Sequence, residues 1–486
     1  MLSDRWIGWL LNLIYAALLL LASPWLLWQQ LSGRKRRQQW RQRLLGPDPK
    51  PQDSGSAEPV LWVHAVSVGE VNLALRFLPA LSEKFPGTIP VLSSTTDTGL
   101  QLANGRLPAH QVVRFPFDFS WAIARLFQRV QPSALLLTEL EIWPNLLSQA
   151  SRAGIPVVVI NARLSEKSFR SYRRLGWLFR RWFEKLDLVV AQTESYAQRF
   201  RALGVPADRV VTAGSIKFDA AETDRENSRT CALRRQFGIS DQRPVCLAGS
   251  TSAPEEAMVL ETYEQVRKTQ PNWRLVVVPR HPERFSEVAG LIQQQCRSHG
   301  WRFRRRSEIA PSQTAQDWDV LLVDTVGELG AWWGTAEMGF VGGSFGSRGG
   351  QSMIEPAAYG VATCFGPRTS NFRDVVALME EHHAGATVDS QESLTAWLQS
   401  MTRDEGGRIA MGQRARQLVM QQAGATERTL SALEGLLQAV VGVRKTLGTK
   451  VADGDCGGLG SEAVGGAGNA TASPHFRAGQ ASKSPR

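Results

Sequence analysis

The chain has 486 residues, of which 43% are hydrophobic and 21% charged, so we expect a globular protein of two or three domains. Its 56 Lys and Arg against 45 Asp and Glu give a net charge of +11, which favours anionic partners, but no recognition helix, zinc-finger spacing or ribonucleoprotein motif points to nucleic acid. Five scattered cysteines without a CxxC pair argue against a disulfide framework or a zinc site and indicate a reducing compartment.

The N-terminal segment predicts a membrane anchor. No charged residue lies between Trp6 and Gly33, and Trp6–Trp28 is about long enough to cross a bilayer, with Trp at both ends. The positive-inside rule places the rest of the chain on the cytoplasmic side of the inner membrane, because the next residues include Arg34, Lys35, Arg36, Arg37, Arg41 and Arg43. We therefore expect residues 1–45 to act as an anchor and basic juxtamembrane segment, a tether that forms no wall of an active-site cleft.

This segment has two other interpretations. A cleaved signal peptide is disfavoured because the basic residues come after the apolar run and because the cysteine usage does not suit export. Asn12 and Pro24 weaken the span, so a helix lying in the plane of the membrane surface stays open as an alternative.

Beyond a linker at Gly46–Glu58, short apolar runs alternate with helical stretches such as Val71–Leu81 and Phe169–Phe183. Such runs are typical of strands that are buried on both faces of a parallel sheet. They form two series, which are Val60–His64, Val91–Ser93, Ala134–Thr138, Val157–Ile160 and Leu188–Ala191, and then Val245–Ala248, Arg274–Val278, Val320–Val323, Met338–Val341 and Ala362–Phe365.

This alternation predicts an α/β protein with two Rossmann-like domains facing each other across a cleft. The first domain is expected at 59–219 and the second at 243–441. A polar stretch at 220–242 is expected to link them, and residues 442–486, rich in Gly, Ala and Ser, are expected to form a disordered tail.

In the first half, candidate site residues come directly after the predicted strands. The segment HAVSVGE places Glu70 in the first turn of a helix, where it is either a charge that suits the helix dipole or a general base. Glu139 and Glu141 lie just past another strand, although alone they are also a helix-start signal. Lys217, in the segment GSIKFD, would by default be an ordinary surface lysine.

In the second half, four polar or glycine-rich segments come after successive strands. Because the carboxyl ends of parallel strands share one edge of a sheet, together they predict a nucleotide site. The segments are Ala248–Ser252, Pro279–Phe285, Asp324–Gly330 and Gly342–Ala358. No Walker A motif and no GxGxxG opening of the first βα unit is present, and none of these four segments contains an acidic DxD pair, so we expect no NTP hydrolysis, no dinucleotide cofactor and no bound metal.

In chain order, the segments HAVSVGE, ELEIWPN, NARLS, GSIKFD, PRHPERF, DTVGELG and GGSFGSRGGQSMIEPAAYG resemble the motifs of the 3-deoxy-D-manno-octulosonic acid (Kdo) transferases. The resemblance extends from the anchor to about residue 440. It implies a GT-B fold, CMP-Kdo as the donor, a lipid A precursor as the acceptor, and inversion at the anomeric carbon. It also implies that no cofactor takes part.

By motif, the resemblance implies that Glu70 is the catalytic base and that Glu139 and Lys217 stabilise the transition state. The implied CMP contacts are Pro279, Arg280, Val326, Gly327, Glu328, Ser352, Met353, Ile354 and Glu355. The chain departs from the family pattern at Gln351 and Ser352, where many members have His-Asn, and at Leu140, where the family has Thr between its two acids.

Two alternatives to this function remain. Another sugar-nucleotide enzyme of the same fold, such as a UDP-sugar transferase or an epimerase, would share the two domains and the glycine-rich segments. A non-enzymatic adaptor tethered to the membrane would explain the anchor and the basic charge, but it would not explain polar motifs at successive strand ends.

Overall fold

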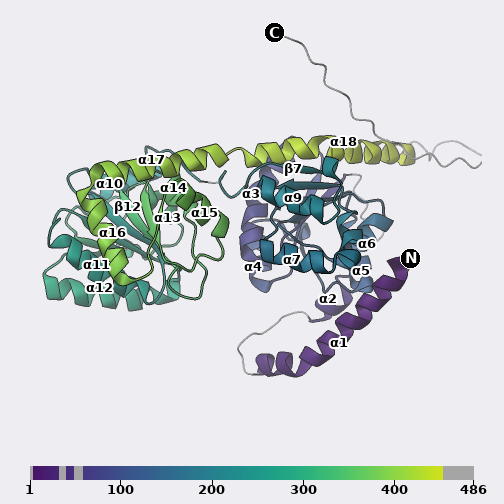
Figure 1. The fold of residues 1–486 in the computed structure, drawn as a ribbon, viewed down its shortest axis with the longest axis horizontal. Coiled ribbons are helices and arrows are strands. Elements are labelled where there is room, and N and C mark those ends of the chain that lie inside the picture. Colours follow the sequence, from purple (N-terminus) through teal and green to yellow (C-terminus); the bar gives the residue numbers. More distant parts are fainter. Residues whose placement is uncertain (1–3, 32–39, 49–57, 220, 453–486) are drawn as a thin grey trace, which may run out of the picture.

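The computed structural model describes residues 4–31, 40–48, 58–219 and 221–452, and two parallel seven-stranded sheets dominate it (Figure 1). Each half of the chain contains one sheet flanked by helices, and the two halves lie side by side. The prediction of an α/β protein with two Rossmann-like domains is confirmed.

The first sheet has the strand order β3-β2-β1-β4-β5-β6-β7. Alternate residues of β1 enter different hydrophobic clusters, Val60 and Trp62 on one face and Leu61 and Val63 on the other. Cover on both faces explains why the strands are continuous apolar runs. The strands are β1 (Val60–His64), β2 (Ile89–Ser94), β3 (Val112–Arg114), β4 (Ala134–Thr138), β5 (Val157–Ala162), β6 (Leu188–Ala191) and β7 (Val210–Thr212).

The helices of this domain connect parallel strands. They are α3 (Val68–Lys84), α4 (Asp97–Asn104), α5 (Ser120–Val130), α6 (Pro144–Arg152), α7 (Glu166–Arg174), α8 (Gly176–Phe183) and α9 (Glu194–Ala202). The predicted helical stretch Phe169–Phe183 is thus two helices, which meet at Leu175.

The second sheet has the order β10-β11-β9-β8-β12-β13-β14, and its apolar strands are also buried between two clusters. Its strands are β8 (Val245–Thr251), β9 (Arg274–Pro279), β10 (Phe303–Arg305), β11 (Val320–Leu322), β12 (Met338–Val341), β13 (Ala362–Phe365) and β14 (Ala386–Thr387). Its helices are α11 (Glu255–Arg267), α12 (Phe285–His299), α13 (Leu329–Trp333), α14 (Ile354–Ala358), α15 (Arg373–Glu381), α16 (Gln391–Arg403) and α17 (Glu405–Gln422).

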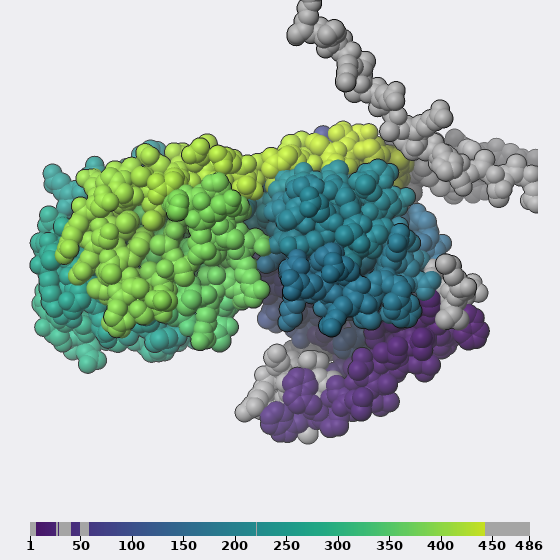
Figure 2. Space-filling model, in the orientation of Figure 1, coloured from purple at the N-terminus to yellow at the C-terminus, as the bar shows by residue number. Residues whose placement is uncertain are grey.

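The chain crosses between the domains twice. The stretch predicted as a linker contains α10 (Ser228–Phe237), whose Leu233 and Phe237 are buried in the core of the second domain. After α17 the chain returns as α18 (Ala425–Ala452), which packs Leu430 and Leu433 into the core of the first domain. Figure 2 shows α17 and α18 along one edge of both halves.

The segment predicted as a tail at 442–486 therefore begins inside a helix, since α18 ends at Ala452. Residues 453–486 lie outside the described part of the chain. Asp219 joins the two crossings, because its carboxylate accepts hydrogen bonds from the backbone N–H groups of Gly424, Ala425 and Thr426 at the start of α18. This contact gives the last residue of the GSIKFD segment a structural role at the helix N-terminus.

The N-terminal helix α1 (Asp4–Leu31) contacts α5 and α6 of the first domain. The side chain of Asn12 is buried, donating to Oγ of Ser120 at 2.7 Å and accepting from the Ser120 N–H at 3.0 Å. The expectation of a plain tether is wrong in this respect, because a polar side chain of the apolar segment finds its partners in the domain.

The basic cluster is only partly described, since residues 32–39 lie outside the described ranges. Arg41 is exposed, but Arg43, in the short helix α2 (Trp40–Leu45), is buried and pairs with Asp97 at 3.0 Å. Arg43 was included in the basic juxtamembrane cluster, but Asp97 holds its guanidinium inside the domain.

Candidate active site at the carboxyl edges of the two sheets

The predicted site residues of the first domain gather at the carboxyl edge of its sheet. Glu70 comes after β1 and Glu139 after β4, and these neighbouring strands flank the point at which the strand order reverses. Ligands of open parallel sheets bind at such a switch point. Lys217 comes after β7 and reaches back to the same place.

Glu70 lies in the first turn of α3, as predicted, and its carboxylate is held by three groups. Oε1 accepts from the Ser67 hydroxyl at 2.8 Å, and Oε2 accepts from the Val66 N–H at 3.0 Å and the Thr138 hydroxyl at 2.9 Å. Only 9% of the residue is exposed. A carboxylate offers about four acceptor positions, so one remains free on Oε1 among the described residues.

Two further carboxylates and one ammonium complete the group. Nζ of Lys217 lies 2.7 Å from Oε1 of Glu139, and both side chains are partly buried. Glu141 accepts a hydrogen bond from the indole N–H of Trp143 at 2.8 Å. The pKa of Glu141 is raised to about 8, mainly by burial and also by the negative charges of Glu70 and Glu139, while the Trp143 hydrogen bond opposes the shift.

Glu141 is one of the two acids after β4 in the sequence, but no role was assigned to it there. Its neighbours Glu70 and Glu139 are 71 and two residues away in the chain, so only the fold brings all three charges together. A Glu141 that is protonated at neutral pH places one negative charge fewer beside Glu70 and Glu139.

Asn161, in the NARLS segment, positions the loop that carries Lys217. Its Oδ1 accepts from the backbone N–H of Ile216 at 3.1 Å, and its backbone has a positive φ of 51°. Its neighbour Arg163 pairs across the domains with Asp374 of α15 at 2.8 Å. The hydroxyl of Tyr196 in α9 also donates to Asp374. The NARLS segment therefore links the Lys217 loop of the first domain to α15 of the second domain.

The predicted CMP contacts come after strands that are neighbours in the second sheet, which are β11, β9 and β12, with β8 between the last two. Pro279 ends β9, and the exposed Arg280 is the next residue. Burial raises the pKa of Glu355, and the positive charges of Arg76 and Arg280 oppose that shift. Arg76 lies on α3, the helix that carries Glu70, so a charge of the first domain is close enough to influence Glu355 of the second.

The three predicted residues after β11 differ in accessibility. Val326 is 79% exposed, and Gly327 has a φ of +91°, which glycine adopts without strain. The carboxylate of Glu328 is paired with two donors of the Arg306 guanidinium, at 2.9 and 3.0 Å. This pair fixes the start of α13, so the loop ahead of it presents a defined backbone.

The loops after β8 and β12 are joined by a buried carboxylate that was not among the candidate residues. Glu255, at the start of α11, accepts from the backbone N–H groups of Ser252, Gly343, Ser344 and Phe345 at 2.7–3.0 Å. Within the 248–252 segment, which was predicted to be part of the nucleotide site, the N–H of Ser252 is therefore occupied by Glu255. In the sequence, Glu255 is visible only as an acid at the start of a helix. An acid at that position is also expected simply because it interacts favourably with the helix dipole.

The last predicted group, 352–355, comes after two glycines with positive φ, Gly349 and Gly350. The side chains of Met353 and Ile354 belong to the hydrophobic core, so only Ser352 and Glu355 carry partly accessible polar side chains. The side chain of Gln351 lies against Gly343, where an added Cβ would be 3.2 Å from it. Gln351 therefore supports the β12 loop.

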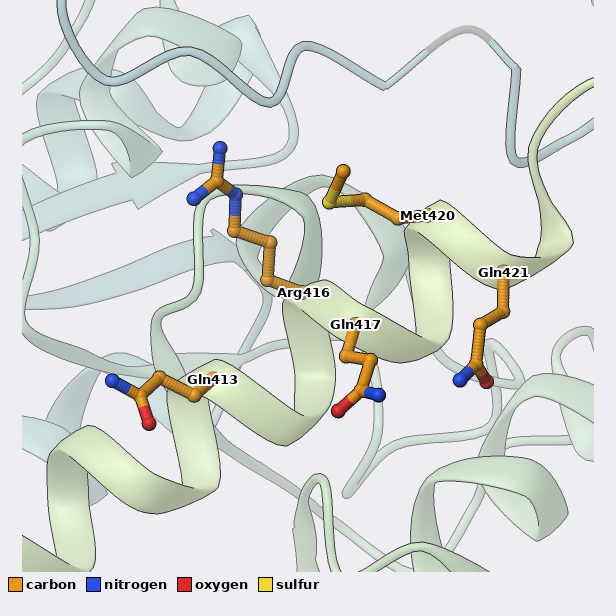
Figure 3. Close-up of a pocket in the computed structure, with 5 residues that line it drawn as sticks. All are labelled: Gln413, Arg416, Gln417, Met420 and Gln421. Carbon is orange, nitrogen blue, oxygen red and sulfur yellow. The ribbon is translucent and has the colours of Figure 1, made fainter.

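No group of three or more His, Cys, Asp or Glu side chains that could hold a metal ion occurs within the described ranges of the chain. A hollow of about 430 Å³ lies on α17 and is lined by Gln413, Arg416, Gln417, Met420 and Gln421 (Figure 3). All five side chains come from one helix, and Figure 3 shows them spread along its surface rather than converging. We therefore place the site at the sheet edges and not in this hollow.

Comparison with known proteins agrees with these motifs. Residues 38–220 match the family model of 3-deoxy-D-manno-octulosonic-acid transferase (kdotransferase). A 3-deoxy-D-manno-octulosonic acid transferase from Bordetella pertussis is 35% identical over 395 residues, which cover 78% of this chain and 88% of the relative. The C-terminal CMP-Kdo binding domain of WaaA from Acinetobacter baumannii is 30% identical, with a TM-score of 0.35, over 39% of this chain and 96% of that domain.

The fold has more distant relatives as well. A UDP-GlcNAc 2-epimerase from Neisseria meningitidis, solved with UDP-GlcNAc, is 15% identical with a TM-score of 0.52, and the match covers 78% of this chain and 100% of the epimerase. At this identity the likeness concerns the fold alone. It agrees with a GT-B arrangement of two facing Rossmann-like domains.

Proposed function

The chain belongs to the 3-deoxy-D-manno-octulosonic acid transferase family, and we propose that it moves Kdo from CMP-Kdo to a lipid A precursor of the tetraacyldisaccharide bisphosphate type, with inversion at the anomeric carbon. The observation that carries the proposal is the placement of Glu70. Its carboxylate is fixed by three donors at the switch point of the first sheet and retains one acceptor position on Oε1 among the described residues.

Glu70 serves as the general base in this mechanism. The acceptor hydroxyl gives its proton to Oε1 of Glu70 as its oxygen bonds to the anomeric carbon of the donor, and the bond from that carbon to the phosphate oxygen breaks. CMP leaves as a phosphate monoester. The Ser67, Val66 and Thr138 donors hold the carboxylate in position, so that little reorganisation is needed during proton transfer.

Lys217 and Glu139 stabilise the charge that develops in the transition state. Their ion pair holds the ammonium 2.7 Å from Glu139, at the sheet edge that also carries Glu70. A fixed cation in a partly buried site can offset negative charge on the donor carboxylate or the leaving phosphate. Arg280 and Arg76, both near Glu355, add positive charge between the two domains.

Donor contacts fall at the carboxyl edge of the second sheet. We assign CMP to the groups after β9, β11 and β12, namely Pro279, Arg280, Val326, Gly327, Glu328, Ser352, Met353, Ile354 and Glu355. Met353 and Ile354 would contribute backbone groups, since their side chains are in the core. The acceptor lies on the first domain, next to Glu70 and on the cytoplasmic leaflet of the inner membrane.

Measuring which nucleotide is released distinguishes the proposed Kdo transfer from the nearest alternative, an enzyme that uses a UDP-sugar. The purified protein is incubated with CMP-Kdo or with UDP-sugars, together with a tetra-acylated diglucosamine phosphate, and free nucleotide and glycolipid mass are measured. Release of CMP with a product heavier by one or more Kdo residues supports the proposal. Release of UDP, or epimerisation of a UDP-sugar without CMP-Kdo turnover, would overturn it, and no turnover of any donor would favour the adaptor.

A further inference from the structure

We propose that α1 lies in the plane of a lipid surface, with one face docked on the first domain and the other in the acyl region, and does not cross the bilayer. This inference rests on the proposed function only in assuming a lipid surface next to the enzyme. Its tests depend on which face of a membrane each residue meets, and so they can fail while the transferase assay succeeds.

The face of α1 that docks on the domain makes specific polar contacts with it. Besides its two hydrogen bonds with Ser120, Asn12 lies 3.4 Å from the side-chain amide of Asn145 in α6. One turn before Asn12, Gly8 is buried with an added Cβ only 3.2 Å from Asn145, so the helix approaches the domain closely. A cleaved leader would not be expected to share interlocking hydrogen bonds with the mature domain.

Both ends of α1 lead to the same domain. Its first half packs Ile7 and Leu11 against the core of the first domain. Past its other end the chain returns as α2, where Arg43 pairs with Asp97 and the indole of Trp121 donates to the carbonyl of Leu44 at 2.9 Å. Figure 1 shows α1 below this domain, with the end near the N-terminus beside α5 and the other end farther from the domain.

A spanning helix is incompatible with this arrangement. The apolar stretch Trp6–Trp25 is 20 residues, about 30 Å at 1.5 Å per residue, which is one hydrocarbon thickness. If it crossed, Asn12 would lie inside the acyl region, and it could not contact Ser120 in the domain that also binds α2. Leaving the side-chain amide in hydrocarbon without these partners is unfavourable.

The other face of α1 has the chemistry of a lipid contact. Only 11% of the apolar stretch is buried in the protein. More than half of the surface of each of these side chains, apart from Ile14, is exposed: Trp6, Trp9, Leu10, Leu13, Ile14, Leu18, Leu20, Leu21, Trp25 and Trp28. Such a helix, apolar on its free face and with basic residues after it in the chain, is typical of an interfacial anchor.

Docking of α1 on the domain also fixes the position of the membrane surface relative to the active site. Asp118 accepts from the backbone N–H groups of Asn145 and Leu146 at 2.9 and 3.0 Å, and α6 begins directly after Trp143, which donates to Glu141. Since α1 contacts this same helix start, the lipid surface has a fixed position relative to the carboxylates. A lipid acceptor could then remain in the leaflet while its head group reaches Glu70.

Labelling from the two faces of a membrane tests the topology. Asp4→Cys and Arg41→Cys are made separately in a chain whose Cys231 and Cys456 are replaced by Ser, and each is treated with a membrane-impermeant maleimide in right-side-out and in inverted vesicles. An in-plane helix predicts that both positions react from the same face. Reaction of position 4 only from the opposite face, or from neither face, would overturn the proposal.

A second measurement tests the docked face itself. Asn12→Leu makes the segment more apolar, so a spanning helix would tolerate it, whereas a docked helix would lose both hydrogen bonds with Ser120 and the contact with Asn145. We expect a lower thermal midpoint for Asn12→Leu in detergent and no change for Leu13→Ala, whose side chain is exposed. An unchanged midpoint for Asn12→Leu would contradict the docking.

Discussion

The ammonium of Lys217 lies 2.7 Å from the carboxylate of Glu139, although 78 residues separate them in the chain. The contact joins the loop after β7 to the loop after β4 and passes over β5 and β6, so it depends on the whole carboxyl edge of the sheet. Asn161 holds the Lys217 loop in place through the N–H of Ile216. The contact between Lys217 and Glu139 therefore depends on how the loops of the site are assembled as well as on the charges of the two groups.

Lys217→Met should lower turnover by roughly 10²- to 10³-fold, as the loss of one charge-stabilising donor typically does. CMP binding should change little, because Lys217 belongs to the first domain. The matched control is Lys268→Met, which removes an exposed Lys–Glu pair of 3.0 Å on α11 and should leave turnover unchanged. Equal losses in the two variants, measured as kcat with CMP-Kdo, would show that Lys217 acts only through stability.

Glu70→Gln should retain the fold and donor binding but lose about 10²- to 10⁴-fold in turnover, because the amide cannot accept the proton. The side-chain amide can still accept from Ser67 or Thr138, so the first turn of α3 should persist. Glu83→Gln, an exposed position on the same helix, is the control. Turnover near that of the unmodified chain for Glu70→Gln would mean that the base is another group.

Much of the fold was predictable, and the missed strands show why the rest was not. Each apolar run singled out in the sequence lies at a strand, and Val60–His64 and Ala134–Thr138 match β1 and β4 at both ends. The strands that were missed include the outermost strand at each edge of both sheets, β3, β7, β10 and β14. Edge strands are short and partly exposed, so they lack the continuous apolar pattern of the inner strands.

The features of the site also divide into those that the sequence could predict and those that it could not. A strand with a Ser/Gly turn after it was enough to predict that Glu70 lies in the first turn of α3, because that signal is local. The raised pKa of Glu141 and the four amides on Glu255 arise from loops far apart in the chain, which only the topology brings together. For the same reason the docking of Asn12 on Ser120 could not be anticipated from an apolar segment.

Glu141 predicts a pH dependence of stability. Its pKa in the folded chain is about 8 against an ordinary value near 4.5, so the protonated form is preferred in the folded state. The stabilisation is complete below about 4.5 and is lost as the pH rises towards 8. Glu141→Gln cannot ionise, so its thermal midpoint should rise relative to the unmodified chain between pH 5 and pH 8. A constant difference across this range would contradict the shift.

Activity should survive excess EDTA. The leaving group is a phosphate monoester, and the charges offered to it come from Lys217, Arg280 and Arg76 rather than from an acidic metal pair. Initial rates with CMP-Kdo are compared with and without chelator, after passage over a chelating resin. Complete loss that only Mg²⁺ restores would require a different mechanism of charge stabilisation.

Deleting residues 1–33 tests whether the anchor is part of the catalytic domain. A plain tether would leave activity on acceptor in detergent intact and reduce only activity on acceptor in vesicles. The structure predicts losses in both, because Ser120 and Asn145 lose the partner that Asn12 provides.

Each buried polar group left without a partner reduces the free energy of unfolding by about 1–3 kcal/mol, and Asn145 lies at the start of α6, just after the Trp143–Glu141 hydrogen bond. We therefore expect a lower thermal midpoint and slower turnover in detergent, with a further loss on vesicles because the lipid-facing side chains are gone. Full-length Asn12→Ala separates these effects, since it keeps the apolar face but removes the contact with the domain. It should reproduce the detergent defect and spare vesicle binding. If the deletion instead matches the full-length chain in detergent, α1 tethers the enzyme without shaping its site.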